Sequence, residues 1–100
     1  MIELYTWPTP NGRKISILLE ELKVPYKVIP INIDNNEQFF EKFSRISPSN
    51  KIPIINDKET GTTIFESGAI MMYLSNKYKK FLDKENYFEI MEWFFFQISQ

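Results

Sequence analysis

The sequence contains neither cysteine nor histidine among its 100 residues. Without cysteine the chain forms no disulfide framework and supplies no thiol nucleophile or redox pair, so any sulfur chemistry has to use a thiol that a ligand brings. Because histidine is missing as well, a zinc site and a Ser-His or Cys-His catalytic pair are excluded from these residues. We therefore expect no metal.

The chain also lacks an excess of either charge and a long apolar run. Twelve basic residues stand against thirteen acidic ones, so the formal net charge of −1 attracts neither nucleic acid nor an anionic membrane surface. No apolar run approaches the ~18 residues of a membrane span, and the early acid Glu3 favours a strand over a signal peptide. We expect a cytoplasmic protein with no nucleic-acid or membrane partner.

The spacing of apolar residues predicts one domain of mixed α/β structure. An apolar content of 43% is enough for one modest core. Ile15, Leu18, Leu19 and Leu22 follow a helical period that ends before Pro25. The predicted elements give the order β-α-β-α-β-β-α: a strand (2–6), a helix (11–24), an edge strand (26–29), a short helix (39–46), a hairpin (53–56 and 62–65) and a helix (67–78).

Two local features belong to this prediction. The short helix is expected to bury a face formed by Phe39, Phe40, Phe43 and Ile46. The helix over 67–78 is expected to have Ser67 as its N-cap, because a serine hydroxyl can accept a hydrogen bond from a free backbone N–H of the first turn.

A further helix is predicted over residues 85–100, with apolar side chains on nearly every face. Such a helix requires cover on several sides. We therefore expect either that the sequence is a fragment or that a partner covers this surface. The change of composition near Asp83 predicts a domain boundary at that point.

Ligands of such a sheet gather where strand ends meet helix starts, and three loops qualify. In the first, Thr9 and Asn11 precede or open a helix whose N-terminus attracts an anion such as a thiolate, although both residues can equally serve only as helix caps. In the second, a cis Pro53 would leave the backbone of Ile52 free to pair with an extended peptide, but local sequence favours the ordinary trans form.

The third loop holds Glu66 and Ser67 at a helix start. A carboxylate suits an ammonium group and a helix N-terminus suits a carboxylate, while the simpler interpretation of Ser67 is an N-cap. The small residues Gly68 and Ala69 would let a ligand approach the backbone there. Gln38 can add an amide contact or remain a solvated surface residue.

Taken together and in order, three motifs resemble the glutathione transferase superfamily, and most closely the N-terminal domain of its nu class. They are Thr9-Pro10-Asn11-Gly12, Arg45-Ile46-Ser47-Pro48 with Asn50-Lys51-Ile52-Pro53, and Phe65-Glu66-Ser67-Gly68-Ala69-Ile70 with Tyr73-Leu74. The resemblance implies a thioredoxin-like glutathione-binding domain over 1–82. It also implies that 83–100 are a linker and the first helix of an all-helical C-terminal domain whose remainder is missing from the sequence.

The same resemblance implies a homodimer that uses glutathione as co-substrate to reduce disulfide bonds, with weaker conjugation of electrophilic small molecules. A non-catalytic interaction module of the same family is the alternative. The roles implied for single residues form one ligand site: Glu66 and Ser67 on the γ-glutamyl group, the Ile52 backbone on the cysteinyl unit beside a cis Pro53, Lys51 and Gln38 near charged and amide groups, and Thr9 and Asn11 as catalytic residues facing the sulfur.

Overall fold

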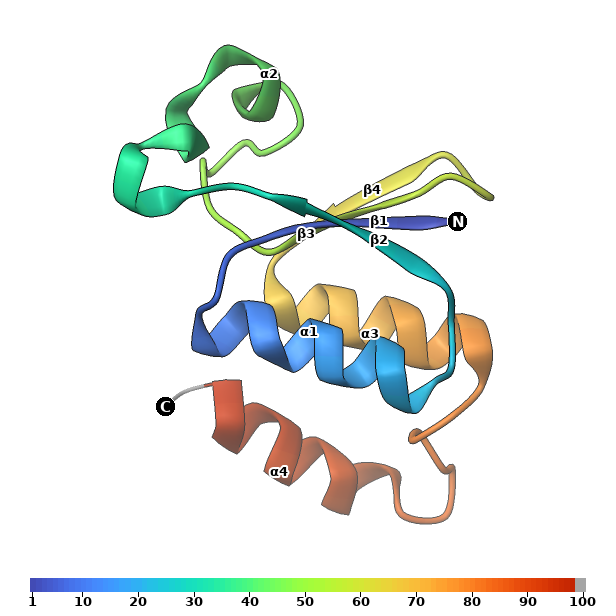
Figure 1. Ribbon diagram of the computed structural model, residues 1–100. Coiled ribbons are helices and arrows are strands. Elements are labelled where there is room, and N and C mark those ends of the chain that lie inside the picture. Colours follow the sequence, from blue (N-terminus) through green and yellow to red (C-terminus); the bar gives the residue numbers. More distant parts are fainter. Residues whose placement is uncertain (99–100) are drawn as a thin grey trace.

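The computed structural model describes residues 1–98 as a four-stranded sheet with helices on both faces, and the predicted order of elements is confirmed (Figure 1). The strands are β1 (Ile2–Thr6), β2 (Tyr26–Pro30), β3 (Ile54–Asp57) and β4 (Thr62–Phe65). The helices are α1 (Pro10–Glu21), α2 (Glu41–Ser44), α3 (Ser67–Tyr78) and α4 (Tyr87–Ile98), and two 3₁₀ turns, Ile33–Asn35 and Glu37–Phe39, precede α2.

The strands lie in the order β2-β1-β3-β4. β1 pairs in parallel with β2, as a β-α-β unit requires, and antiparallel with β3, which forms the predicted hairpin with β4. Leu4 in β1 lies opposite Val28 in β2 and Ile55 in β3. As predicted, β2 is an edge strand, where Pro30, which has no N–H, is tolerated at its end.

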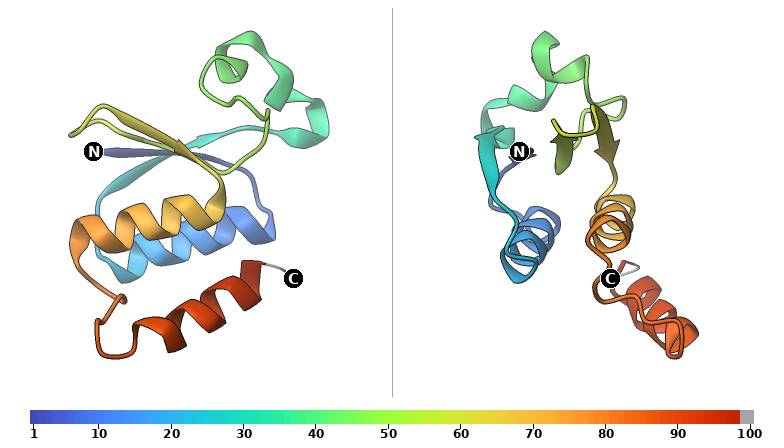
Figure 2. Two further views of the ribbon diagram at one scale, coloured as in Figure 1. Left: turned by 180° about the vertical axis from the view of Figure 1, so that it is seen from behind. Right: turned by 90° about the vertical axis from the view of Figure 1, so that its right-hand side faces the viewer.

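The main core lies between the sheet and the helices α1 and α3, which run side by side beneath it (Figure 2). Alternate strand residues face this layer, so that Leu4 and Ile55 are fully buried against Ile15 and Leu19 of α1. The buried members of this cluster are Ile2, Leu4, Ile15, Leu19, Leu22, Ile55, Ile70 and Leu74. This layer fixes the N-terminal ends of α1 and α3 at the same side of the molecule.

The opposite face of the sheet carries a smaller core, and here the predicted short helix is partly wrong. Phe43 is buried with Ile54 and packs against the ring of Tyr5 at a centroid distance of 6.1 Å. However, α2 is a single turn, because Phe40 has an extended backbone (φ −64°, ψ 139°) that separates it from the preceding 3₁₀ turn. Phe39 and Phe40 therefore lie outside the core, 63% and 59% exposed.

A buried carboxylate ties the hairpin to α3. Asp57, 1% exposed, accepts hydrogen bonds of 2.6 Å from Lys77 Nζ and from the Tyr73 hydroxyl, and one from the N–H of Glu59. Burial raises the pKa of the Asp57 carboxyl, but these hydrogen bonds lower it by more, so that its pKa lies below the ordinary value. The hydrogen bond to Asp57 raises the pKa of Lys77 in turn.

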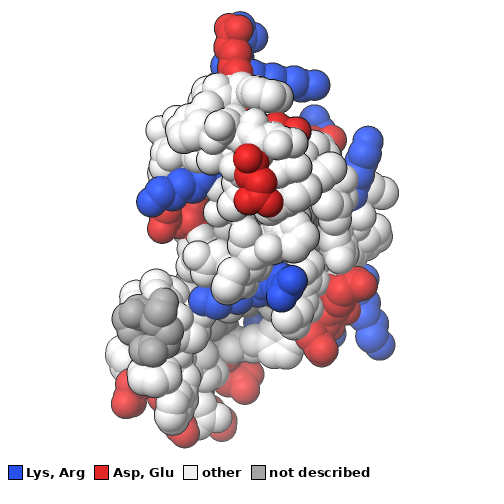
Figure 3. Space-filling model, turned by 60° about the vertical axis from the view of Figure 1, so that its left-hand side comes forward, with Lys and Arg blue, Asp and Glu red and all other residues white. Residues whose placement is uncertain are grey.

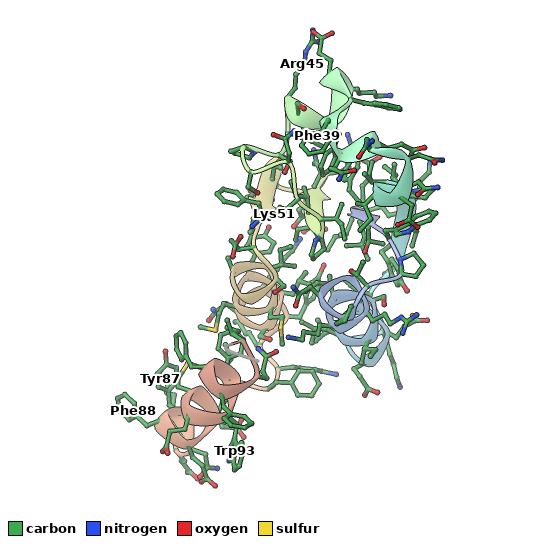
Figure 4. All side chains as sticks on the ribbon, turned by 90° about the vertical axis from the view of Figure 1, so that its left-hand side faces the viewer. Phe39, Arg45, Lys51, Tyr87, Phe88 and Trp93 are labelled. Carbon is green, nitrogen blue, oxygen red and sulfur yellow. The ribbon has the colours of Figure 1, made fainter. Side chains whose placement is uncertain are left out.

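The helix α4 forms a separate layer below α1 and α3 (Figures 1 and 2). It confirms the predicted helix between residues 87 and 98, and the predicted residues 99 and 100 lie outside the described part. None of its described residues is buried, and Phe88 and Trp93, 80% and 64% exposed, project away from the sheet (Figure 4). The broad apolar surface expected from the sequence is therefore present and lies open along this helix. Of the described helices, none has the length and apolar character that crossing a membrane requires.

Candidate functional site

The loop that enters α1 is fixed by a capping hydrogen bond and by a glycine. Thr9 is the N-cap, and its Oγ1 accepts a hydrogen bond of 3.1 Å from the N–H of Gly12. A Cβ on Gly12 would lie 2.7 Å from the carbonyl oxygen of Trp7, so only glycine lets the loop fold this closely over the helix start. The capping interpretation of Thr9 is thus confirmed, yet its hydroxyl hydrogen is not used in that bond and can be donated elsewhere.

The loop that enters β3 contains a cis peptide bond between Ile52 and Pro53. The expectation drawn from the family resemblance is confirmed, whereas the preference of the local sequence for a trans bond was wrong. Since β3 begins only at Ile54, Ile52 lies outside the sheet, and in the described part of the chain its backbone makes no hydrogen bond. Its N–H and C=O are available to an extended ligand.

Two side chains that sequence reasoning left without a role hold this loop in place. Ser47, 1% exposed, accepts a hydrogen bond from the Lys51 N–H and donates one to the Lys51 carbonyl, both 3.1 Å long. Asn50 has a left-handed backbone (φ 56°) and donates through Nδ2 to the Gln38 carbonyl and to the Ser44 hydroxyl. The residue types at 47–50, Ser-Pro-Ser-Asn, are typical of a turn, but they do not indicate these partners.

The start of α3 differs in its capping residue from the prediction. Ser67 is the first helical residue and not the N-cap; Glu66 has the cap position, with φ 74° and no side-chain capping bond. The first backbone hydrogen bond joins Ile70 N–H to Glu66 C=O, so the N–H groups of the turn before it remain free for an anion. Gly68 also lies close to α4, because a Cβ there would lie 2.9 Å from Ile98 Cδ1.

These three loops meet at two adjoining cavities, which share Asn11, Lys51 and Ile52. The larger has a volume of about 840 Å³ and is lined by Thr9, Pro10, Asn11, Lys14, Ile33, Gln38, Asn50, Lys51, Ile52, Phe96 and Gln97. The smaller, of about 150 Å³, is lined by Asn11, Ser49, Lys51, Ile52, Pro53, Glu66 and Ser67. Every predicted site residue thus lines one cavity or both. Figure 4 views this side along α1 and α3, with Lys51 above their N-terminal ends.

The charges of the two cavities differ. The smaller one combines the carboxylate of Glu66 with the free N–H groups at the start of α3, which suits a group carrying both an ammonium and a carboxylate. The larger one has two lysines, Lys14 and Lys51, and no acidic residue among the described residues of its lining. It therefore favours anions near the N-terminus of α1. Within residues 1–98 no cluster of His, Cys, Asp or Glu is suited to a metal ion.

Sequence reasoning missed the contribution of Lys14 on α1 and of α4 to the larger cavity. Phe96 and Gln97 of α4 close its lower wall, and Lys14 Nζ donates a hydrogen bond of 3.4 Å to the Gln97 carbonyl. The Oε1 of Gln38 and the Nε2 of Gln97 are buried without a hydrogen-bond partner. Buried polar atoms of this kind usually have a partner, and both belong to side chains that line the cavity.

The fold and the arrangement of this site define a class of protein: the chain belongs to the glutathione transferase family. Residues 1–76 match the family described as glutathione S-transferase, N-terminal domain. The order of elements, with the cis proline before β3, is the thioredoxin-like fold of that domain. The predicted fold class and family are therefore confirmed.

Individual relatives cover almost the whole chain. It is 42% identical over 106 aligned positions to the disulfide-bond oxidoreductase YfcG of Escherichia coli, covering 99% of this chain and 49% of that protein. It is 39% identical to the protein URE2 of Debaryomyces hansenii, covering 90% of this chain and 32% of the relative. A glutathione transferase from Pseudomonas putida, crystallised with glutathione disulfide bound, superposes with a TM-score of 0.89 at 38% identity, covering 97% and 45% of the two chains. The chain thus spans half the length of these relatives or less.

Proposed function

We propose that the natural protein carrying this sequence is a glutathione-dependent disulfide-bond reductase that also conjugates glutathione to electrophilic small molecules. A glutathione thiolate attacks one sulfur of a disulfide, forms a mixed disulfide and releases the other half as a thiolate, which takes up a proton. A second glutathione thiolate attacks the mixed disulfide and yields glutathione disulfide and the second thiol. Two glutathione molecules thereby supply the two electrons that reduce one disulfide.

The smaller cavity would hold the γ-glutamyl end of glutathione. Its α-carboxylate would accept hydrogen bonds from the Ser67 hydroxyl and the free N–H groups of α3, and its ammonium would pair with Glu66. The cysteinyl unit would extend along Ile52, whose backbone is outside the sheet, with Pro53 beside it. Lys51 and Gln38 would lie near the remaining charged and amide groups, since both line the larger cavity.

The sulfur would then lie at the start of α1, where the helix dipole and two side chains favour its ionised form. Thr9 would donate its free hydroxyl hydrogen to the thiolate, and Asn11, which is exposed between the two cavities, would donate through its amide. The chain has no cysteine, so the only nucleophile in this scheme is the ligand's own thiolate.

One observation carries the proposal: seven predicted residues from three separate loops, together with Gln38 from the 3₁₀ turn before α2, line two cavities that share a wall. The name of the Escherichia coli relative, a disulfide-bond oxidoreductase, and the glutathione disulfide in the Pseudomonas putida structure support the same chemistry. We also propose the wider features of the family for this chain: a homodimer, a cytoplasmic location, and a boundary that separates 1–82 from the linker and helix at 83–100. The family match over 1–76 and the separate layer of α4 support that boundary.

The test is an assay of the natural protein with glutathione and a small disulfide, run beside a standard conjugation assay. We expect saturable, glutathione-dependent reduction of the disulfide and weaker conjugation. If neither reaction occurs while calorimetry shows bound glutathione, the non-catalytic interaction module is the better description.

A further inference from the structure

We infer that Lys14 and Gln97 form a recognition point for a carboxylate of the disulfide substrate, so that the site prefers anionic disulfides to neutral ones. This inference rests on the proposed function and names the substrate class of the same site. It concerns the part of the larger cavity between α1 and α4, away from the residues assigned to glutathione's γ-glutamyl end.

The geometry places two donors together on that wall. Lys14 follows Asn11 by one helical turn, so both side chains lie on the same side of α1 and line the same cavity. The ammonium of Lys14 lies 3.4 Å from the backbone carbonyl of Gln97. An ammonium has three N–H donors, and this contact uses one of them. Two donors of Lys14 therefore remain for a ligand.

The side chain of Gln97 supplies the second, independent observation. Its Nε2 is buried and has no hydrogen-bond partner, although the residue lines the cavity. An unpaired buried donor costs free energy that an accepting group of a ligand would recover. A carboxylate offers two acceptor oxygens, enough to engage the Gln97 amide and the Lys14 ammonium at once.

The charge of the cavity agrees with this assignment. Among residues 1–98, the charged residues in its lining are Lys14 and Lys51, and Lys51 also lines the smaller cavity on the glutathione side. Lys14 is thus the cation left for the second substrate. Figure 3 shows a group of basic side chains just above the junction with α4, which lies at the lower left, with acidic side chains to the right of this group and below it.

The reaction is the two-step reduction given above, so the carboxylate group takes no part in bond making or breaking. Its role is to hold the disulfide with one sulfur near the glutathione thiolate. Lys14 could instead recognise a carboxylate of glutathione itself. In that case its replacement would raise the KM for glutathione equally with both disulfides, and the experiment below distinguishes the two roles.

The experiment compares dithiodipropionate with its uncharged diamide, which has nearly the same size and the same disulfide. Initial rates with the natural protein at saturating glutathione give kcat/KM for each. We expect Lys14→Gln to lower the ratio of the two values, dianion over diamide, about five-fold, as for a partly exposed charge pair. Lys14→Arg should retain the ratio, and added salt should reduce it in the wild type. Arg13→Gln is the matched control, because Arg13 is an exposed neighbour that does not line either cavity.

Three outcomes are distinguishable. A fall of the ratio in Lys14→Gln but not in Arg13→Gln supports the inference. An unchanged ratio, or a raised KM for glutathione that is equal with both disulfides, overturns it and leaves the proposed function standing. A wild type that reduces neither disulfide contradicts the proposed function itself.

Discussion

The hydroxyl of Thr9 has two roles in this account, and substitutions at this one position separate them. Its oxygen accepts the capping hydrogen bond from the N–H of Gly12, and its hydrogen is the proposed donor to the glutathione thiolate. Thr9→Val removes both roles at nearly constant volume. Thr9→Ser keeps both, and Thr9→Asp keeps the cap but replaces the donor with a negative charge.

The magnitudes follow from the two hydrogen bonds. Loss of a threonine N-cap costs about 1 kcal/mol, which lowers Tm by roughly 4–8 °C for a domain of this size. Loss of a hydrogen bond to a charged group costs about 1.5–3 kcal/mol, which corresponds to a fall of about 10- to 150-fold in kcat if the bond is made to the reacting sulfur. Thr9→Val should show both effects, and Thr9→Ser neither.

Thr9→Asp is the decisive variant, because aspartate is a good N-cap and cannot donate a hydrogen bond when ionised. Its Tm should stay near the wild-type value while kcat falls at least as far as in Thr9→Val. The assays are thermal unfolding and steady-state disulfide reduction at saturating glutathione. If kcat in Thr9→Val and Thr9→Asp equals the wild-type value, Thr9 is a helix cap and nothing more.

Three further predictions concern the loop, the ligand and the fold. Gly12→Ala should destabilise the protein by about 1–3 kcal/mol in urea unfolding, because the new methyl group overlaps the Trp7 carbonyl; an unchanged midpoint would show that the loop can relax. Ser67→Ala should weaken glutathione binding by about 3- to 10-fold in calorimetry and change kcat less, and unaltered affinity would remove Ser67 from the ligand site. The pKa of Asp57 is lowered in the folded state, so its stabilisation is present above the unfolded pKa of about 3.9 and is lost as pH falls through the folded pKa. Asp57→Asn should therefore reduce the acid dependence of stability in that window, and an identical dependence in both proteins would contradict the role of the contact with Lys77.

The sheet and its two long helices were predictable because their patterns are local. Ile15 and Leu19 fall on one face of a helical period, and both are fully buried in α1. The hairpin followed from two β-rich runs around a polar turn, and β3 and β4 confirm it. In each case the apolar residues whose spacing identifies the helix or strand are also the residues that pack in the core. Their spacing alone is therefore enough to predict the element.

The second helix was beyond this kind of reasoning. The run from Phe39 to Ile46 has helical spacing, yet the chain leaves helical geometry at Phe40, so that Phe43 is buried, Ile46 is partly buried against it, and Phe39 and Phe40 are exposed. The position at which the helix is interrupted depends on the sheet surface formed by Tyr5 and Ile54, which belong to distant segments of the sequence. The spacing of apolar residues gives no information about the shape of the surface against which a segment packs.

The candidate site, too, was only partly predictable from the sequence. Thr9, Ile52 and Ser67 were found at loop ends from residue type, while their meeting at one pair of cavities came from the topology of the sheet. The cis form of Pro53 was expected only from the family resemblance. The contacts of Lys14 and Gln97 join residues 83 positions apart, and nothing in the local sequence of either residue indicates the other.

We propose that this site binds glutathione and holds its sulfur as a thiolate at the N-terminus of α1. The most direct measurement is a pH titration of the ultraviolet absorbance of glutathione bound to the natural protein, at concentrations where calorimetry shows the site to be full. We expect the bound thiol to ionise at a lower pH than free glutathione, and Thr9→Val to shift this ionisation back upward. A titration curve of the bound thiol that coincides with that of free glutathione would contradict the account.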